Sequence, residues 1–560
     1  MELTEGSTNV ERAVAAVSHT VSRLGVREVV VCAGARNTPI LVAAARHPLV
    51  RCWRHFDERS AGFFALGRIK ATKRPVAVVV TSGTAVAELL PSVIEGFYAG
   101  EPLVVIAGDR QAEWRGGGAP QSIEQAGIFG GYALCADLRG EANDGALLDD
   151  VCLRWEENRT SPVFFNLCFS EPLFDGGIAV DFGELGDEVI TRDEPCFALS
   201  ADDFAPRTGV VVGQIDESDR RDVASALANL GLPVWAEVTS GLAVFPELAE
   251  LLIPDWATFL HDDELKPDQL VRLGGVPNGR FWRDLESLPE VRVTSVSEVG
   301  MRGLGREQNV VIERRDVEDW VNAWSKCGYR GDGDWIAAVL AKAAAEREVI
   351  RECVAEFSTS EVGLMAKLLK AASEADVAFF GNSLSIREAQ LVAGNELAGR
   401  IHASRGANGI DGQLSTFIGS AVGAAEAWGV FGDLTTLYDF SAPWMLDQVD
   451  AATAWRFVVI NNGGGKIFSR LPYLEALSDA EDALLVNDTS NVDFGDWARL
   501  WKMQHVVVKV PEDFDQIDAT DSRVLVEIRP DAAASEAFWR TLRKSRLSMG
   551  GEPRMDTNAH

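Results

Sequence analysis

Two glycine-rich segments in the last third of the chain carry side chains that could bind a metal ion. The first is Gly432-Asp433-Leu434, and the second is Asn461-Asn462-Gly463-Gly464-Gly465. Mg²⁺ takes about six oxygen ligands, usually one or two protein carboxyl or amide oxygens together with phosphate oxygens and water. Asp433 and Asn462 supply such oxygens, so the two segments predict a site for a divalent cation and a phosphate-bearing group.

The expected strands place these two side chains at the same edge of a sheet. Asp433 would follow one strand directly, and Asn462 would follow the next, residues 457–460. Ligands bind at this carboxyl edge in open α/β folds. Glycines let a diphosphate approach the backbone, and we expect the carbonyl of Gly464 to be a further metal ligand. The alternative is two ordinary glycine-rich turns. A Gly-Asp pair alone would favour that alternative, whereas the joint pattern argues against it.

Short apolar, β-branched runs alternate with amphipathic helical segments along the whole chain, which is the pattern of parallel α/β sheets. We therefore expect an α/β fold with three doubly wound parallel-sheet domains. The expected strands are residues 28–32, 75–80, 102–107 and 162–166, then 209–213, 232–238, 269–274, 291–296 and 309–312, and finally 376–380, 457–460, 506–510 and 524–528. Helices are expected at residues 10–24 and 85–99, and a long linker helix at 336–357.

The length of 560 residues exceeds what one hydrophobic core can organise. Changes in composition and turn-rich stretches divide the chain into three domains. We predict an N-terminal domain at residues 1–185, a central α/β domain at 200–335, a C-terminal domain at 350–545 and a flexible tail at 546–560.

The charge balance limits the partners. Against 53 Lys and Arg the chain has 84 Asp and Glu, a formal net charge of −31. Such a charge repels phosphate backbones and anionic membranes, so nucleic-acid binding is disfavoured. An acidic surface is typical both of a highly soluble protein and of one from a salty cytoplasm, and composition does not separate the two.

Cysteine usage and the N-terminus bear on the compartment. The eight cysteines are scattered without a C-x-x-C pair, as expected for core cysteines in a reducing compartment. The N-terminus lacks a basic region followed by an apolar run, and no stretch approaches the roughly 20 apolar residues of a membrane span. We expect a cytoplasmic protein without membrane insertion.

The Gly-Asp and Asn-Asn pair resembles the thiamine-diphosphate signature, in which Gly-Asp-Gly precedes Asn-Asn by a similar interval. Leu434 replaces the second glycine here, which argues against the pyruvate-type members. Further segments, spread over nearly the whole chain, resemble the family of 2-succinyl-5-enolpyruvyl-6-hydroxy-3-cyclohexene-1-carboxylate synthases. They are Gly34-Ala35-Arg36-Asn37-Thr38-Pro39, His55-Phe56-Asp57-Glu58-Arg59, Thr81-Ser82-Gly83-Thr84-Ala85, Gly381-Asn382-Ser383, Arg405-Gly406-Ala407-Asn408-Gly409-Ile410-Asp411-Gly412, Gly432-Asp433-Leu434-Thr435 and residues 461–468.

The resemblance implies a thiamine-diphosphate-dependent transferase of menaquinone biosynthesis with Mg²⁺ or Mn²⁺. Its substrates would be 2-oxoglutarate, which is decarboxylated, and isochorismate, which receives the succinyl unit. The three domains would be a pyrimidine-binding, a central and a diphosphate-binding domain, in a homodimer or homotetramer with the cofactor at the subunit interface. The alternatives are another thiamine-dependent 2-oxoacid decarboxylase or carboligase, a flavin-bearing acetolactate-synthase relative, or a non-catalytic protein of this fold.

Glu58 is the catalytic residue that the resemblance implies. In the family this glutamate lies against the aminopyrimidine ring of a cofactor held by the partner subunit, where a carboxyl group in an apolar site can exchange a proton with the ring. The alternative is that Asp57 and Glu58 form the acidic first turn of a helix through residues 63–66. The cofactor-binding residues implied are Glu58, Thr81, Gly83, Ser383, Asn408, Gly409, Ile410, Gly432, Asp433, Leu434, Asn462, Gly464, Gly465, Ile467 and Phe468, and the metal ligands are Asp433, Asn462 and Gly464.

Arginines dominate the implied substrate site, as suits substrates with several carboxylates. Ser383 and Arg387 are four residues apart, so one helical turn would present both to the same side. The alternative is solvated or ion-paired arginines in an acidic protein, and core packing for the apolar members. The substrate residues implied are Arg36, Arg110, Gln121, Arg280, Ser383, Arg387, Arg405, Ile467, Phe468 and Leu471, and the sequence departs from the family at Ala35, Pro120 and Arg280.

Overall fold

A computed structural model gives the fold. It describes residues 7–174, 182, 197–297, 303–305, 310–313, 317–397, 399–449, 452–468, 477–486, 488–517 and 521–549. By their internal contacts the residues form two compact units. The first unit comprises Met1–Arg192, Ser404–Gly423 and Tyr438–Ala451, and the second comprises Asp193–Ala403, Ala424–Leu437 and Ala452–His560.

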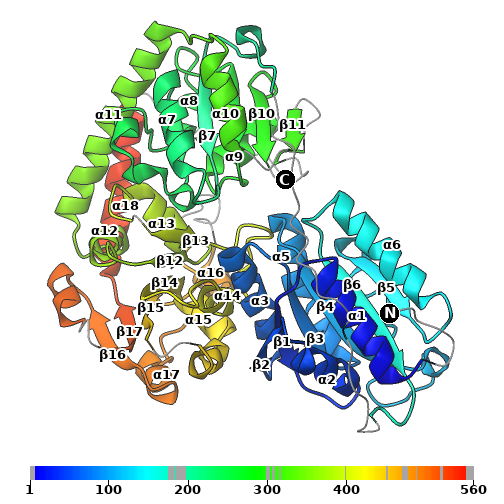
Figure 1. Cartoon of the computed structure of the whole chain (residues 1–560). Coiled ribbons are helices and arrows are strands. Elements are labelled where there is room, and N and C mark those ends of the chain that lie inside the picture. The colour runs from blue at the N-terminus through cyan, green and yellow to red at the C-terminus, as the bar shows by residue number, and fades with distance from the viewer. Residues whose placement is uncertain are drawn as a thin grey trace. The chain divides into compact units, whose positions relative to one another are not determined.

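The first unit is built on a six-stranded parallel sheet with the order β2-β1-β3-β4-β6-β5. Helices α1 and α6 cover one face of this sheet (Figure 1), and their apolar sides join its core. The strands are β1 (Glu28–Cys32), β2 (Arg51–His55), β3 (Val76–Val80), β4 (Leu103–Arg110), β5 (Leu134–Leu138) and β6 (Val163–Phe169). The helices are α1 (Asn9–Ser22), α2 (Thr38–Arg46), α3 (Glu58–Thr72), α4 (Thr84–Ala87), α5 (Leu90–Ala99) and α6 (Asp144–Glu157).

Helix α3 is buried along nearly its whole length because α14 (Gln413–Ser420), far away in the sequence, packs against it. The crossing is close at two glycines. A Cβ at Gly67 would collide with the backbone oxygen of Thr416, and a Cβ at Gly419 with the backbone oxygen of Phe64. Glycine at both positions therefore lets the two backbones approach.

The second unit contains a five-stranded sheet and a six-stranded sheet, both parallel. Their orders are β11-β10-β9-β7-β8 and β13-β12-β14-β15-β17-β16. The first of these sheets has β7 (Thr208–Val212), β8 (Val234–Ala236), β9 (Gln269–Leu273), β10 (Arg292–Ser297) and β11 (Val310–Glu313). The other has β12 (Val377–Phe380), β13 (Arg400–His402), β14 (Glu426–Gly432), β15 (Ala454–Ile460), β16 (Gln504–Val508) and β17 (Arg523–Ile528).

Helices flank both sheets of the second unit. The long helix α11 corresponds to the linker helix predicted at residues 336–357. Helix α18 continues to Ser548, inside the segment 546–560 predicted as a tail. The helices are α7 (Arg220–Leu230), α8 (Ala257–Leu260), α9 (Arg280–Asp284), α10 (Val317–Lys326), α11 (Gly333–Glu356), α12 (Glu361–Ala371), α13 (Leu384–Val392), α15 (Asp433–Tyr438), α16 (Asp479–Val486), α17 (Phe494–Leu500) and α18 (Ala532–Ser548).

Three parallel sheets flanked by helices confirm the predicted α/β fold class. Each expected strand has its counterpart, whereas β2, β5 and β13 were not expected. The residue limits of the three predicted domains remain a prediction. Among the described helices, none has the length and apolar character that crossing a membrane requires.

Candidate active site

The carboxyl edge of the sheet around β14 brings the two glycine-rich segments together. Strands β14 and β15 are paired with Gly432 opposite Ile460, so Asp433 and the turn after β15 leave the sheet side by side. The Asp433 side chain is buried, and its Oδ1 accepts the backbone N–H of Leu434 at 2.7 Å. Its Oδ2 accepts the N–H groups of Gly464 at 2.7 Å and Gly463 at 3.2 Å. The two glycine-rich segments therefore meet at a single carboxylate, that of Asp433.

Thr489 completes the surroundings of this carboxylate. Its hydroxyl donates to Oδ2 of Asp433 at 2.8 Å. Burial raises the pKa of Asp433, while the hydrogen bonds from Thr489, Gly464, Leu434 and Gly463 oppose that shift. No lysine or arginine among the described residues forms an ion pair with Asp433. A buried carboxylate without a positive partner fits a site that receives a cation.

Asn462 offers a second oxygen in the same turn. Its amide nitrogen donates to both carboxylate oxygens of Glu361, at 3.1 and 3.2 Å. Its amide oxygen Oδ1 is buried and has no hydrogen-bond partner in the described part of the chain. The third predicted ligand, Gly464, directs its N–H to Asp433, and its carbonyl accepts the N–H of Lys466 at 2.8 Å. The oxygens of Asp433 and Asn462 therefore suit a hard divalent cation.

The rest of the predicted diphosphate loop follows directly. The N–H of Gly465 donates to the carbonyl of Val486, and a Cβ at Gly465 would lie 3.1 Å from that oxygen. Ile467 and Phe468 are half-buried in the same loop. Leu471 lies outside the described residues. Within the described ranges, no group of three or more His, Cys, Asp or Glu side chains could hold a metal, so a cation here would be bound by the single carboxylate of Asp433 together with amide and backbone oxygens.

Ser383 and Arg387 flank the point where the strand order of this sheet reverses. The chain leaves β12 for β13 on one side, whereas β14, which leads to Asp433, lies on the other. Ser383 begins α13 with a φ of 72°, a strained conformation for a residue other than glycine. Arg387 donates to the backbone oxygen of Ser383 at 2.7 Å, so the guanidinium lies next to the backbone of Ser383.

Glu58 lies in the first unit as the first residue of α3. The Asp57 side chain caps this helix by accepting the N–H of Ser60 at 3.2 Å. Glu58 itself is half-buried. Its pKa is raised, chiefly by burial and further by the negative charges of Asp57 and Glu88, although a backbone hydrogen bond opposes this. Asp57 thus has the capping role, while the Glu58 carboxyl is biased towards its protonated form.

Thr81 and Gly83 follow β3 at the carboxyl edge of the first sheet. A Cβ at Gly34 would lie 2.5 Å from the Cβ of Thr81, so the loops after β1 and β3 touch. The hydroxyl of Thr81 is buried without a hydrogen-bond partner in the described chain. Gly83 has a φ of 90°, and a Cβ there would lie 3.2 Å from Cα of Gln121. Thr81, Gly83 and Gln121 therefore form one cluster.

Two predicted substrate arginines lie at the same edge, and both have protein partners. Arg36 forms an ion pair with Glu171, 2.7 Å between Nη2 and Oε1. Arg110, at the end of β4, donates from Nε to the carbonyl of Pro120 at 2.8 Å and lies over the ring of Trp114. In the second unit, Arg280 is exposed at the start of α9, 3.6 Å from Asp284 of the same helix.

The segment before α14 carries Arg405, Asn408, Gly409 and Ile410. The buried carboxylate of Glu95 on α5 holds it by accepting the N–H groups of Gly406 at 2.8 Å and Ala407 at 2.6 Å. Arg405 is half-buried, and Asn408 has a φ of 61°. The sequence did not single out Glu95, because a lone acidic residue within an apolar helix has no local signature.

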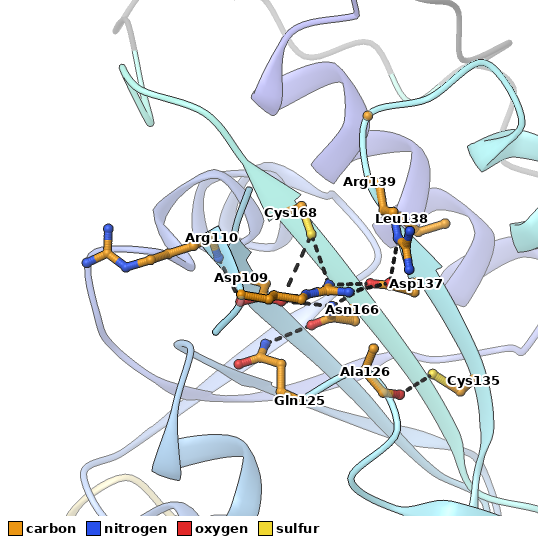
Figure 2. Close-up of polar contacts among 12 residues, drawn as sticks. Asp109, Arg110, Gln125, Ala126, Cys135, Asp137, Leu138, Arg139, Asn166 and Cys168 are labelled. Atoms are coloured by element: carbon orange, nitrogen blue, oxygen red, sulfur yellow. Dashed lines mark hydrogen bonds and ion pairs between the residues drawn. The ribbon is translucent and has the colours of Figure 1, made fainter. Parts of the chain in front are cut away.

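A buried polar network under the Gly83 turn was also missed. Figure 2 shows it at the carboxyl ends of β4, β5 and β6. The amide oxygen of Gln125 accepts the N–H of Gly83 at 3.0 Å, and its amide nitrogen donates to Asn166 at 2.7 Å. Asn166 donates in turn to Asp109 at 3.1 Å and to Asp137 at 2.7 Å. These two carboxylates accept only, so they set the orientation of both amides and that of Gly83.

Arg115 pairs with both carboxylates, and Arg139 pairs with Asp137 as well. Arg115 binds Asp137 with both terminal nitrogens at 2.7 Å, and Asp109 at 3.0 Å. Burial would raise the pKa of Asp137, but hydrogen bonds from Arg115, Asn166 and Arg139 outweigh it and lower the pKa to about 2. The Arg115–Asp137 ion pair therefore stabilises the fold at neutral pH, and this stabilisation is lost as the pH falls from 3.8, the usual pKa of an aspartate, through about 2.

We expect Asp137→Asn to destabilise the first unit by about 3 kcal/mol, since it leaves the half-buried Arg115, which also contacts the buried Asp109, with only part of its counter-charge. Urea unfolding followed by circular dichroism measures the loss, and the difference from the wild type should vanish below about pH 2. The control is Arg139→Gln at a half-exposed position, which should cost less than about 1 kcal/mol. Equal losses in both variants would contradict this assignment.

Comparison with known proteins identifies the family of this chain. Residues 11–128 match the family model described as thiamine pyrophosphate enzyme, N-terminal TPP binding domain. Three relatives share the name 2-succinyl-5-enolpyruvyl-6-hydroxy-3-cyclohexene-1-carboxylate synthase. The relative from Akkermansia muciniphila is 38% identical over 521 residues, 91% of this chain and 95% of the relative. The relative from Bdellovibrio bacteriovorus is 35% identical over 544 residues, 95% of this chain and 98% of the relative.

The third relative, from Chloroflexus aurantiacus, is 33% identical over 526 residues, 87% of either chain. Identity of this level over almost the full length covers all three sheets. It also covers both glycine-rich segments around Asp433 and Asn462. The chain therefore belongs to the family of 2-succinyl-5-enolpyruvyl-6-hydroxy-3-cyclohexene-1-carboxylate synthases, which are transferases that depend on thiamine diphosphate.

Proposed function

We propose that this chain decarboxylates 2-oxoglutarate and joins the remaining four-carbon unit to isochorismate. The observation that carries the proposal is the buried Asp433 carboxylate, which forms no ion pair with Lys or Arg among the described residues. It accepts hydrogen bonds from the turn that follows Asn462, whose buried amide oxygen has no hydrogen-bond partner in the described part of the chain. The chain also belongs to this family. Family membership argues against the pyruvate-type carboligases. The intact carboxyl groups of Glu58 and Asp433 argue against a non-catalytic role.

Asp433 and Asn462 would hold a Mg²⁺ or Mn²⁺ ion through their oxygens. The Gly464 carbonyl, which accepts the N–H of Lys466, has a second lone pair with which it would join them. The backbone of Gly432, Leu434 and Gly465 would lie against the diphosphate. When bound, thiamine diphosphate supplies the electron sink for loss of CO₂ and for the new carbon–carbon bond. Thr81, Gly83, Asn408, Gly409, Ile410, Ile467 and Phe468 would surround its rings and its diphosphate.

Glu58 would exchange a proton with the aminopyrimidine ring of the cofactor. Its raised pKa, caused mainly by burial, keeps the proton on the carboxyl group at a higher pH than for an exposed glutamate. A carboxyl group of this kind can give its proton to a ring nitrogen and take it back. Asp57 holds the helix start, so the Glu58 side chain keeps a defined position.

The arginines would bind the substrate carboxylates. Ser383, Arg387 and Arg405 would face substrate and bind its carboxylates, and Arg36, with Arg110, Gln121 and Arg280, would bind the second substrate, isochorismate. A guanidinium fork binds a carboxylate with two hydrogen bonds and suits these anions. Arg36 and Arg280 also contact Glu171 and Asp284, and each guanidinium has five N–H donors, so it would bind a substrate carboxylate beside its protein partner or in its place.

We further propose that the chain acts as a homodimer or a larger homo-oligomer. An exposed aromatic cluster of the first unit supports this, since Phe56 and Trp444 are 58% and 48% exposed and their rings pack edge to face. Tyr438 and Phe440 are exposed in the same segment as Trp444. Exposed apolar clusters of this kind are typical of protein interfaces. A cytoplasmic location agrees with the sequence and remains part of the proposal.

Product analysis tests the proposed reaction. Purified protein with thiamine diphosphate and Mg²⁺ would receive 2-oxoglutarate with and without isochorismate, and CO₂ and product mass would be measured. A succinyl-cyclohexene adduct that requires both substrates is the expected result. Release of CO₂ from pyruvate but not from 2-oxoglutarate would overturn the substrate assignment, and a yellow flavin-containing preparation would point to the acetolactate-synthase relatives.

A further inference from the structure

Glu361 lies beneath the turn that carries Asn462, although 101 residues separate them in the sequence. It is the first residue of α12, and Ser360 caps that helix by accepting the N–H of Gly363 at 3.0 Å. The Glu361 side chain is buried, and its own N–H donates to the hydroxyl of Ser535 at 2.9 Å. The backbone hydrogen bond of Glu361 and the helix cap at Ser360 therefore hold the Glu361 carboxylate in place.

The Glu361 carboxylate determines the orientation of the side-chain amide of Asn462. A primary amide has a donor end and an acceptor end, whereas an ionised carboxylate only accepts hydrogen bonds. Both oxygens of Glu361 lie within 3.2 Å of Nδ2 of Asn462, so the donor end must face Glu361. The oxygen Oδ1 then points to the opposite side.

The amide oxygen that this orientation directs away from Glu361 is also the atom that lacks a hydrogen-bond partner among the described residues. Oδ1 of Asn462 is buried with no hydrogen bond in the described part of the chain. Leaving a buried polar atom unsatisfied is destabilising, so such atoms in folded proteins call for a ligand or an ion. The adjoining glycine turn places Asp433 nearby, because its Oδ2 accepts the N–H of Gly463, the residue after Asn462.

We propose that Glu361 is a positioning residue for the divalent cation: it fixes the Asn462 amide with its oxygen directed to the metal. This inference rests on the proposed function, in which Asn462 is a metal ligand. Glu361 does not bind the metal itself. Its role is that of the outer groups that orient ligands, whose loss typically lowers metal affinity by about 10–100-fold.

A merely structural role is the competing explanation, since acidic residues in the first turn stabilise helices. Glu361→Gln separates the two roles because it preserves volume and the helix start. A glutamine can accept from Nδ2 of Asn462 or donate to its Oδ1, so it allows both amide orientations. The matched control is Asp334→Asn, which removes an exposed carboxylate from the first turn of α11.

The test is Mn²⁺ binding to the full-length protein at saturating thiamine diphosphate, with free Mn²⁺ followed by electron paramagnetic resonance. We expect Glu361→Gln to weaken Mn²⁺ binding by about 10–100-fold, with an unchanged thermal unfolding midpoint of the metal-free protein. Asp334→Asn should bind like the wild type. Wild-type affinity in Glu361→Gln would overturn the inference, while absence of any Mn²⁺ binding by the wild type would overturn the proposed metal site itself.

A second variant adds a rescue. Asn462→Asp in the Glu361→Gln background offers an oxygen whichever way it turns, so no orienting group is required. We expect the double variant to regain most of the lost Mn²⁺ affinity. Equal weakness of the double and the single variant would contradict a positioning role.

Discussion

Glu58→Gln is expected to lower kcat by about 10²–10⁴-fold, the usual contribution of a positioned acid–base group. A glutamine of the same size cannot exchange a proton, whereas the half-buried carboxyl group is biased to carry one. Binding of Mn²⁺ and thiamine diphosphate should stay within a few-fold of the wild type. Steady-state kinetics and direct cofactor titration measure the two quantities separately.

The control is Glu88→Gln, which removes a neighbouring negative charge without touching the carboxyl group. The charge of Glu88 helps to raise the pKa of Glu58, so its loss should lower that pKa. The limb of the kcat/KM profile that reports the Glu58 carboxyl group should therefore move to lower pH, while the maximum rate stays similar. A Glu58→Gln variant that retains more than about a tenth of the activity would remove Glu58 from the catalytic role.

Asp433→Asn is expected to lower Mn²⁺ affinity and kcat/KM by at least about 100-fold, beyond the range for an orienting group. The carboxylate supplies the negative charge of the proposed site, and its Oδ2 accepts the N–H groups of Gly463 and Gly464. Titration with Mn²⁺ at fixed thiamine diphosphate measures the effect. Thr489→Val is the matched control, since it removes one hydrogen bond to Asp433 and should cost about 1 kcal/mol, or about fivefold.

Mixing the two inactive variants tests the shared site of the proposed dimer. If Glu58 of one subunit serves the Asp433 site of another, a mixed dimer contains one complete site. Random exchange makes about half of the dimers mixed, so about a quarter of the wild-type activity should return. No recovery after demonstrated subunit exchange would place both residues in the same subunit's site.

The buried strands could be predicted from the sequence because their composition depends on local burial. Central parallel strands are covered on both faces and therefore become apolar runs, as in β3, where every residue is buried. The edge strands β2 and β5 include exposed residues and charged side chains, so the same criterion missed them. The Asp433 and Asn462 pair could also be predicted from the sequence, since each residue comes just after its strand and β14 and β15 are neighbours.

Only the tertiary structure decided which distant groups support the site. Thr489 and Glu361 reach Asp433 and Asn462 across 56 and 101 residues, and a single hydroxyl or carboxyl group has no local pattern. The same holds for Gln125, whose orientation depends on Asn166 and two carboxylates from other strands.

The sequence by itself determined the fold class, the family resemblance and the residues with chemical potential, because residue type, periodicity and spacing are local properties. The tertiary structure decided that residues 404–423 and 438–451 group with the first 192 residues. The physical reason is the close crossing of α3 and α14 at Gly67 and Gly419, where complementary surfaces from distant segments meet. Such complementarity depends on two surfaces at once, and neither segment reveals it alone.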